Sequence, residues 1–268
     1  MDLGLDGRVA VVTGASRGIG LAVTRGLLDE GARVVAVSRT TGPDLAALEG
    51  PALRHLPADL TDPDAPERAV EAAVREFGAL DVLVNNAGGP PPGTKLPRAS
   101  FFDADDADWA AMLDFNLMTA VRAARAAIPR MLTAGGGAIV NVSTTLAVAP
   151  SPVNVDYGAA KAAVNSLGKA LSEEFAPRGV RVNTVSPAGV RTPWWTDADG
   201  AADRIAAMVG ADREEVLDSV GPRMLGMLTG RLIDPQEIAD VVLLLCSPRS
   251  GSTTGANFTV DGGSVKVL

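Results

Sequence analysis

Short runs of Val, Ile and Leu alternate along the chain with longer Ala-rich segments in which apolar residues recur every three or four positions. The short runs predict strands that are buried on both faces, and the amphipathic segments predict the helices that cover them. This alternation is typical of a parallel sheet wrapped by helices. We therefore predict an α/β fold, a doubly wound parallel sheet of about seven strands. The predicted strands are residues 9–12, 33–37, 53–56, 82–84, 138–142, 180–185 and 257–260.

Two of the predicted helices have clear end signals. Thr61-Asp62 is expected to cap a helix that has Pro63 in its first turn and ends at Gly78. The run Asp234-Pro235-Gln236-Glu237 predicts the start of another helix, which runs to about Cys246.

No linker or sustained repeat divides the chain, so residues 1–268 are expected to form one dinucleotide-binding catalytic domain. Two stretches, at residues 88–93 and at about 187–230, are longer than ordinary connections. Both follow predicted strands, at the carboxyl edge where open α/β sheets bind ligands. We expect the second stretch to be a substrate lid.

Composition and charge exclude several classes of protein. The 24 Lys and Arg against 32 Asp and Glu give a net charge of −8, which is unfavourable for binding nucleic acid or an anionic membrane. No apolar run reaches the ~18 residues of a membrane span. The single cysteine cannot form an internal disulfide, and the acidic residues within positions 1–6 are unlike a secretory signal. We expect a cytoplasmic protein with a small-molecule partner, and, with one His and one Cys, no metal site.

The first predicted strand leads directly into a glycine-rich turn, Thr13-Gly14-Ala15-Ser16-Arg17-Gly18-Ile19-Gly20, and then into a helix. Glycines allow a tight turn and let a pyrophosphate approach the N-terminus of the helix, whose free N–H groups favour anions. A glycine-rich turn alone could be an ordinary loop, but its place after a strand and before a helix favours a Rossmann-type dinucleotide site. The residues expected to contact the cofactor here are Gly14, Ser16, Arg17, Gly18, Ile19 and Gly20.

The end of the second predicted strand bears on the choice of coenzyme. An acidic residue there would bind the ribose 2′-hydroxyl of NAD, whereas Arg accommodates the 2′-phosphate of NADP. The chain has Ser38 and Arg39, with no acid before Asp44, and Arg17 could reach the same phosphate. Although either Arg alone could be a plain surface charge, together they predict NADP.

The most specific set of candidate catalytic residues consists of Ser143, Tyr157 and Lys161. Tyr157 and Lys161 are four residues apart, on one face of a predicted helix. An unperturbed Tyr titrates near ~10, and a neighbouring ammonium is expected to stabilise the phenolate and lower that pKa. Ser143, just past the fifth strand, can donate to a carbonyl oxygen beside the phenol. A bare Tyr–Lys pair is more often inert, but this Tyr is the only one in the chain and this Lys is one of four.

These motifs resemble the classical short-chain dehydrogenase/reductase family over essentially the whole chain. The turn at Ser38 and Arg39, with Arg17, resembles the NADP-preferring carbonyl reductases of that family. The matching segments are 13–20, Asp59-Leu60, 85–88, Asn116, Ser143, Tyr157 to Lys161, 183–192 and 261–263.

The resemblance implies a catalytic set. Tyr157 would be the acid/base, and Ser143 would hold the substrate oxygen. Lys161 would bind the nicotinamide ribose and tune Tyr157, while Asn116 would position a water in a proton relay.

The resemblance also implies further cofactor contacts. Asp59 would face the adenine, and Thr192 would hold the carboxamide. Ala188 stands where the family usually has Gly, so the loop that carries Thr192 is expected to follow a somewhat different path. The other expected contacts are Leu60, Asn86, Ala87, Gly88, Pro187, Gly189 and Val190, together with Tyr157 and Lys161.

The predicted function is NADP(H)-dependent transfer of a hydride between the nicotinamide and a carbonyl or secondary alcohol substrate. Apolar residues in the lid suggest an apolar partner, although they could equally pack the lid onto the body. One alternative is a 3-oxoacyl-carrier-protein reductase, for which Arg130 and Arg178 are the nearby basic residues. Another is a non-catalytic NADP-binding sensor or scaffold. The resemblance further implies a homotetramer.

Overall fold

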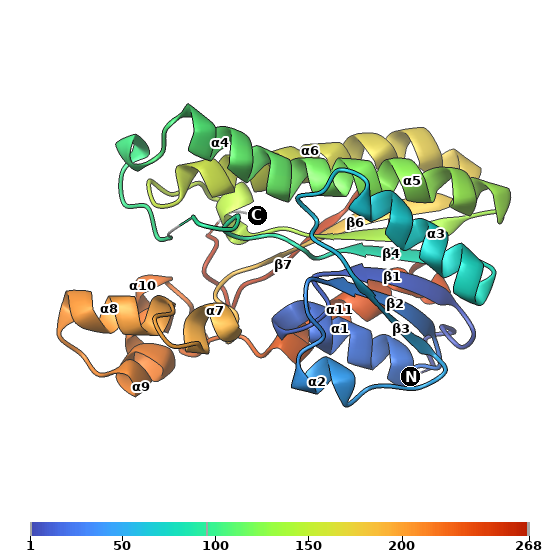
Figure 1. Ribbon diagram of the computed structural model, residues 1–268. Coiled ribbons are helices and arrows are strands. Elements are labelled where there is room, and N and C mark those ends of the chain that lie inside the picture. The colour runs from blue at the N-terminus through green and yellow to red at the C-terminus, as the bar shows by residue number, and fades with distance from the viewer. Residues whose placement is uncertain (1, 95, 267–268) are drawn as a thin grey trace.

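A seven-stranded parallel sheet forms the centre of the protein, with the strand order β3-β2-β1-β4-β5-β6-β7. The computed structural model describes residues 2–94 and 96–266. Helices cover both faces of the sheet (Figure 1). This confirms the predicted fold class, and every predicted strand is present. The strands are β1 (Val9–Thr13), β2 (Arg33–Ser38), β3 (Leu53–Pro57), β4 (Val82–Asn85), β5 (Gly137–Val142), β6 (Val180–Pro187) and β7 (Asn257–Val260).

The helices form two layers. One face of the sheet packs against α1 (Gly18–Asp29) and α11 (Pro235–Cys246), with the short α2 (Pro43–Ala46) nearby. The other face packs against α3 (Ala65–Phe77), α5 (Thr119–Thr133) and α6 (Val155–Phe175). The chain reaches α5 through α4 (Asp106–Leu113) and the π-helical turn η2 (Asp114–Met118). Short 3₁₀ turns are η1 (Phe101–Asp103), η3 (Thr145–Ala147), η4 (Ala176–Arg178) and η6 (Pro248–Ser250).

The uninterrupted apolar runs follow from this sandwich. Successive side chains of a strand point to opposite faces, so a strand covered on both sides needs apolar residues at every position. In β1, Ala10 and Val12 belong to the core on the α1 and α11 side, whereas Val9 and Val11 belong to the core on the α3 and α5 side. All four are essentially inaccessible to solvent.

The start predicted for α3 is wrong, although its end is correct. The helix begins at Ala65 after the N-cap residue Asp64. Thr61 instead lies in a turn, where its main-chain N–H and its hydroxyl both donate to Asp59 Oδ1. Gly78 ends the helix in the left-handed conformation, at φ 83°.

The start and end predicted for α11 are confirmed. Asp234 accepts from the N–H of Gln236, and Glu237 accepts from the N–H of Asp234, which is the reciprocal arrangement of a capping box. The helix ends at Cys246, which is buried.

The segment from 187 to 230 folds into short helices that project from one edge of the body (Figure 1). Trp195, Val216 and Leu217 are buried in it and join the core on the α1 and α11 side. Its helices are α7 (Pro193–Thr196), α8 (Ala201–Val209), α9 (Arg213–Glu215), η5 (Val216–Val220) and α10 (Gly221–Met224).

Within residues 2–94 and 96–266, no helix is both long and apolar enough to cross a membrane. The same residues contain no group of three or more His, Cys, Asp or Glu side chains that could hold a metal ion.

Candidate active site at the carboxyl edge of the sheet

The glycine-rich turn joins β1 to the start of α1. It contains four of the predicted cofactor contacts, Gly14, Ser16, Gly18 and Ile19. Gly20 has no room for a side chain, because a Cβ there would lie 2.2 Å from the carbonyl oxygen of Gly14. Arg17 is the N-cap residue of α1, and its side chain makes no capping hydrogen bond. The first amides of this helix therefore lack a side-chain cap, which suits a phosphate group.

Asn86 ties the end of β4 to the glycine-rich turn. Its side-chain amide donates to the carbonyl oxygens of Thr13 and Gly14, at 2.9 and 3.1 Å. The Thr13 hydroxyl oxygen accepts from the main-chain N–H groups of Asn86 and Ala87, both at 3.0 Å. On the other side of the strand end, Asn85 donates to Asn141 of β5 at 2.9 Å. These amides link neighbouring strands.

Gly88, Asn116 and Lys161 converge at this edge of the sheet. A Cβ on Gly88 would lie 2.7 Å from Lys161 Nζ and 2.9 Å from Asn116 Oδ1, so only glycine fits between them. Asn116 is buried in the π-helical turn η2, where its amide donates to the carbonyl oxygen of Gly89 at 2.9 Å and accepts from the Gly89 N–H at 2.8 Å. Such a turn interrupts the regular helix and is common at functional sites.

Ser143 and Lys161 come together where β5 ends against α6. The Ser143 hydroxyl donates to the main-chain oxygen of Lys161 at 3.3 Å, and Lys161 Nζ donates to the carbonyl oxygen of Val142 at 2.8 Å. Both side chains are nearly inaccessible. Tyr157, one turn earlier on α6, is partly buried and packs with Leu96 and Met112.

Burial sets the protonation of this pair. Burial raises the pKa of the Tyr157 phenol to about 12 and lowers the pKa of the Lys161 ammonium to about 8, because each charged form loses hydration. The sequence predicted a lowered phenol pKa, and the structure corrects that. Desolvation dominates at Tyr157, and the Lys161 ammonium is directed at Val142. At neutral pH the phenol is protonated.

A buried ion pair next to Tyr157 was not predicted from the sequence. Arg98 and Asp156 form a charge-assisted hydrogen bond, and their side chains are 8% and 1% exposed. Asp156 also accepts from the N–H of Tyr157 at 2.9 Å, and Arg98 pairs with Asp108 at 2.7 Å. Asn154, just before α6, accepts from the N–H of Arg98 and donates its own N–H to Arg98 O. Because Arg98 and Asp156 are 58 positions apart in the sequence, no local pattern connects them.

The loop after β2 presents Arg39 to solvent, while Ser38 is buried. The Ser38 hydroxyl donates to the carbonyl oxygen of Thr40 at 2.9 Å. Asp59, after β3, is exposed and close enough to Arg39 for their charges to interact. Hydrogen bonds from Thr61 lower the pKa of Asp59.

Leu60 follows Asp59 and is buried at 5% exposure. Its carbonyl oxygen accepts from the Thr119 hydroxyl at 3.2 Å. The Asp59-Leu60 pair therefore joins the end of β3 to the start of α5, directly after the π-helical turn that carries Asn116.

The start of the segment 187–230 returns to the glycine-rich turn. Pro187 ends β6, Gly189 is buried, and Val190 forms an isolated bridge with Ile233. Thr192 lies against Gly18, because a Cβ on that glycine would be 3.1 Å from the Thr192 methyl group. A second link from this segment to the glycine-rich turn is an ion pair at 3.0 Å between Arg17 and Asp197, with both side chains mostly exposed.

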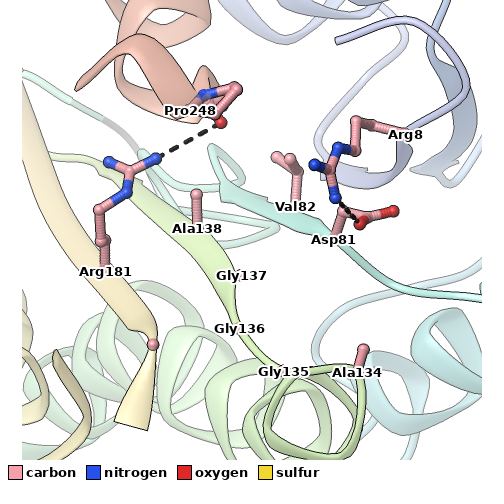
Figure 2. A pocket seen from close by; sticks show the side chains of 12 residues that line it. Arg8, Asp81, Val82, Ala134, Gly135, Gly136, Gly137, Ala138, Arg181 and Pro248 are labelled. Carbon is pink, nitrogen blue, oxygen red and sulfur yellow. Dashed lines mark hydrogen bonds and ion pairs between the residues drawn. The ribbon is translucent and has the colours of Figure 1, made fainter. Parts of the chain in front are cut away.

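A cavity of about 240 Å³ lies at the opposite, amino-terminal edge of the sheet (Figure 2). Its lining includes Val82, Ala138 and Arg181, which stand at or near the starts of β4, β5 and β6. Arg8 pairs with Asp81 across its mouth at 2.7 Å. None of the predicted site residues lines it.

Comparison with known proteins identifies the family. The family model described as enoyl-(acyl carrier protein) reductase matches residues 14–265. The 3-alpha-(or 20-beta)-hydroxysteroid dehydrogenase of Mycobacterium tuberculosis is 35% identical over 266 residues, which are 98% of this chain and 92% of that protein. The chain belongs to the short-chain dehydrogenase/reductase family. It is therefore an oxidoreductase of a family that uses a nicotinamide cofactor.

Two further relatives bear on the kind of substrate. The 3-oxoacyl-(acyl-carrier-protein) reductase of Vibrio cholerae is 33% identical over 264 residues, covering 97% of this chain and 98% of that protein. The L-sorbose reductase of Gluconobacter frateurii, solved with NADPH and L-sorbose, is 33% identical with a TM-score of 0.89, and each chain is covered completely. Among these short-chain dehydrogenases/reductases the substrates are therefore diverse.

Proposed function

We propose that this short-chain dehydrogenase/reductase is an NADP(H)-dependent enzyme that interconverts a carbonyl compound and a secondary alcohol. The observation that carries the proposal is the convergence of Ser143 and Lys161 with Gly88 and Asn116, with Tyr157 one turn before Lys161 on α6 and an uncapped helix N-terminus nearby. A pure nucleotide-binding scaffold has no need for a phenol and an ammonium in this arrangement.

The residues present fit a dinucleotide cofactor. Gly20 and Gly88 allow the glycine-rich turn and the end of β4 to pack closely against their neighbours, because a Cβ at either position would collide with protein atoms. The N-terminus of α1 offers N–H groups to a pyrophosphate. Lys161 would bind the nicotinamide ribose, and Thr192 the carboxamide. When bound, the nicotinamide supplies or accepts the hydride.

The chain's own residues would handle the proton. With a pKa far above neutral pH, the Tyr157 phenol carries a proton and can donate it to a carbonyl oxygen during reduction. The Lys161 ammonium would then stabilise the phenolate that remains. Ser143 would donate to the same substrate oxygen, and Asn116 would hold a water that returns the proton from solvent.

The preference for NADP(H) rests on the loop after β2. Arg39 is exposed there, and Ser38 stands where an acidic residue would repel a phosphate. The NADPH-bound L-sorbose reductase supports this choice. Arg17 could also bind this phosphate if its ion pair with Asp197 breaks. That pair costs little to break, because both side chains are exposed.

We propose an apolar substrate held under residues 187–230. Trp195 and Met227 are buried and pack the lid onto the body, whereas other apolar lid residues remain exposed and available to a ligand. These exposed residues are Trp194, Met208, Met224, Leu225 and Leu228.

A second candidate is reduction of a 3-oxoacyl group on a carrier protein. The relative from Vibrio cholerae favours it, and Arg130 and Arg178 are both exposed, as an acidic carrier would require. Arg178, however, lies over the ring of Phe175, at 5.5 Å from its centroid. Because Arg178 is engaged with this ring, we rank this candidate second.

The test is consumption of NADPH with a panel of ketones, quinones and acyl thioesters, followed by the reverse panel of alcohols with NADP. Turnover of a ketone or quinone supports the first proposal, and turnover confined to acyl thioesters supports the second. Tight NADPH binding without turnover across both panels would contradict both.

We further propose a cytoplasmic homotetramer. One interface would pair the helical segments 108–132 and 157–175 of two copies. The other would use α11 and the edge strand β7, where Leu244 and Phe258 are exposed at 42% and 37%. Light scattering at micromolar concentration tests this, and a monomer mass would contradict it.

A further inference from the structure

The single histidine of the chain lies under the loop that carries Arg39. His55 is on the edge strand β3, in register with Ala36 of β2. Its Nε2 atom is 3.0 Å from Ser38 Oγ, and its Nδ1 atom is 3.0 Å from Thr41 Oγ1. Both ring nitrogens therefore bond to the same short loop, on either side of Arg39.

The donors and acceptors of this contact can be assigned. Because the Ser38 hydroxyl donates its only proton to the Thr40 carbonyl, its oxygen must accept from a proton on Nε2 of His55. In the neutral imidazole Nδ1 then has a free lone pair, to which the Thr41 hydroxyl can donate.

The surroundings of the ring favour that neutral form. Burial is the largest effect and lowers the pKa of His55, and the charge of Arg54 lowers it further. A hydrogen bond to the Ser38 main chain acts in the opposite direction but is outweighed. The other charged groups near the loop are Arg39 and Asp59.

The contacts hold the loop in one conformation. Ser38 is 7% exposed and Thr41 is partly buried, whereas Arg39 and Thr40 between them face solvent. The two anchored hydroxyls therefore fix both ends of a turn whose middle is free to meet a ligand. Fixing a binding loop in advance reduces the conformational entropy lost when the ligand binds.

We propose that His55 is a positioning residue for coenzyme choice, holding residues 38–41 so that Arg39 meets the phosphate monoester on the adenosine ribose. This rests on the proposed preference for NADP(H). His55 acts through Ser38 and Thr41, so its removal weakens the contact with the phosphate. NADH, which lacks the phosphate, is almost unaffected.

The test is kcat and KM for NADPH and for NADH with one active substrate. His55→Leu removes both hydrogen bonds, and Thr41→Val removes one of them without altering the core. Thr41→Ser keeps the hydroxyl, and His55→Gln keeps an N–H near the position of Nε2. These two serve as matched controls.

His55→Leu should lower kcat/KM for NADPH roughly three- to thirtyfold through KM, which is the range for one or two neutral hydrogen bonds. Thr41→Val should lower kcat/KM for NADPH by a smaller factor, and Thr41→Ser should retain the wild-type value. His55→Gln should give a value between those of His55→Leu and the wild type. In all four variants kcat/KM for NADH should stay within about twofold of wild type, which also reports that each variant is folded. An unchanged NADPH value in His55→Leu and Thr41→Val, or equal losses with both coenzymes, would overturn the proposal.

A spectroscopic readout is available because the imidazole signals of the only His need no assignment. NADPH should raise the pKa of His55 measured by NMR more than NADH does, since a phosphate near the loop stabilises the imidazolium. Equal effects of the two coenzymes would count against the proposal.

The two proposals can fail separately. Equal use of NADH and NADPH by the wild type would overturn the coenzyme preference, and the role of His55 with it. If the wild type prefers NADPH and Arg39→Ala loses that preference while His55→Leu keeps it, only the role of His55 is wrong.

Discussion

Lys161 Nζ donates a hydrogen bond to the main-chain carbonyl oxygen of Val142, at 2.8 Å, in the interior of the protein. The bond fixes the ammonium at the junction of α6 and the end of β5, close to Gly88 and Asn116. A single neutral acceptor does not replace the hydration of an ammonium, and burial lowers the pKa of Lys161 to about 8. The charge therefore reduces the stability of the fold, as is often found for active-site groups.

We predict that Lys161→Met makes the protein more stable and inactive. The pKa displacement from 10.5 to about 8 corresponds to an unfavourable ~3 kcal/mol at pH 7. Leaving the Val142 carbonyl without a partner offsets ~1 kcal/mol of the gain. The free energy of unfolding should thus rise by ~2 kcal/mol in urea titrations, while turnover is lost and NADPH binds more weakly.

The pH dependence of that stability difference provides the control. Between about pH 8 and 10.5 the folded chain binds fewer protons at Lys161 than the unfolded chain does, so wild-type stability gains with rising pH in this window. Other groups contribute equally to both proteins. The advantage of Lys161→Met should therefore shrink from pH 7 to pH 9.5, and a constant difference would contradict a lowered Lys161 pKa.

Tyr157→Phe should abolish most activity while NADPH still binds. The substitution removes the hydroxyl proposed to transfer the proton and keeps the ring that packs on Leu96 and Met112. General acid–base catalysis is typically worth ~10²–10⁴-fold, so kcat should fall at least that far. Retention of most of the activity would show that another group moves the proton. Coenzyme binding measured by fluorescence checks that the variant is folded.

The sequence predicted the sheet more fully than the site. The inner strands β1, β2 and β4 were found because apolar residues fill both faces of a covered sheet, and Asp234 identified α11 through a local capping pattern. The start of α3 was placed too early because Thr61 and Asp62 also resemble a cap, although Thr61 bonds to Asp59. Local patterns of this kind compete, and the chain sequence does not show which one prevails.

Contacts between side chains that are distant in the sequence could not be predicted from local sequence patterns. Arg98 and Asp156 meet only because the loop after β4 folds against the start of α6. Likewise, nothing in the spacing of the sequence places His55 opposite both Ser38 and Thr41. The phenol pKa was also predicted in the wrong direction, since burial depends on the finished fold.

Removal of Arg98 should destabilise the protein more than removal of the Asp156 charge. Arg98→Met leaves Asp156 buried without its ion-pair partner, and breaking such a pair costs ~3–5 kcal/mol. Asp156→Asn leaves Arg98 paired with Asp108 and should cost less. The double variant should be more stable than Arg98→Met alone, because no unpaired carboxylate remains. Unfolding in urea measures the three values, and equal losses in the two single variants would contradict this ordering.

The coenzyme preference should be reversible at Ser38 and Arg39. NADP differs from NAD by one phosphate, and a charge-assisted hydrogen bond contributes ~1.5–3 kcal/mol, so one good contact from Arg39 should favour NADPH by roughly 10–150-fold. Screening by salt lowers this figure, because Arg39 is exposed. Arg17 adds less than a second full contact, since Asp197 competes for it and two Arg on one phosphate are not additive.

In the double variant Ser38→Asp/Arg39→Ala, the new carboxylate would accept from the ribose 2′-hydroxyl of NADH and repel the phosphate of NADPH. The ratio of kcat/KM for the two coenzymes, measured on one substrate in wild type and double variant, should invert. Asp197→Asn serves as the control for Arg17: releasing that guanidinium should improve NADPH use slightly and leave NADH use unchanged. If the wild type used both coenzymes equally well, Arg39 and Arg17 would be surface charges only, and the NADP assignment would be wrong.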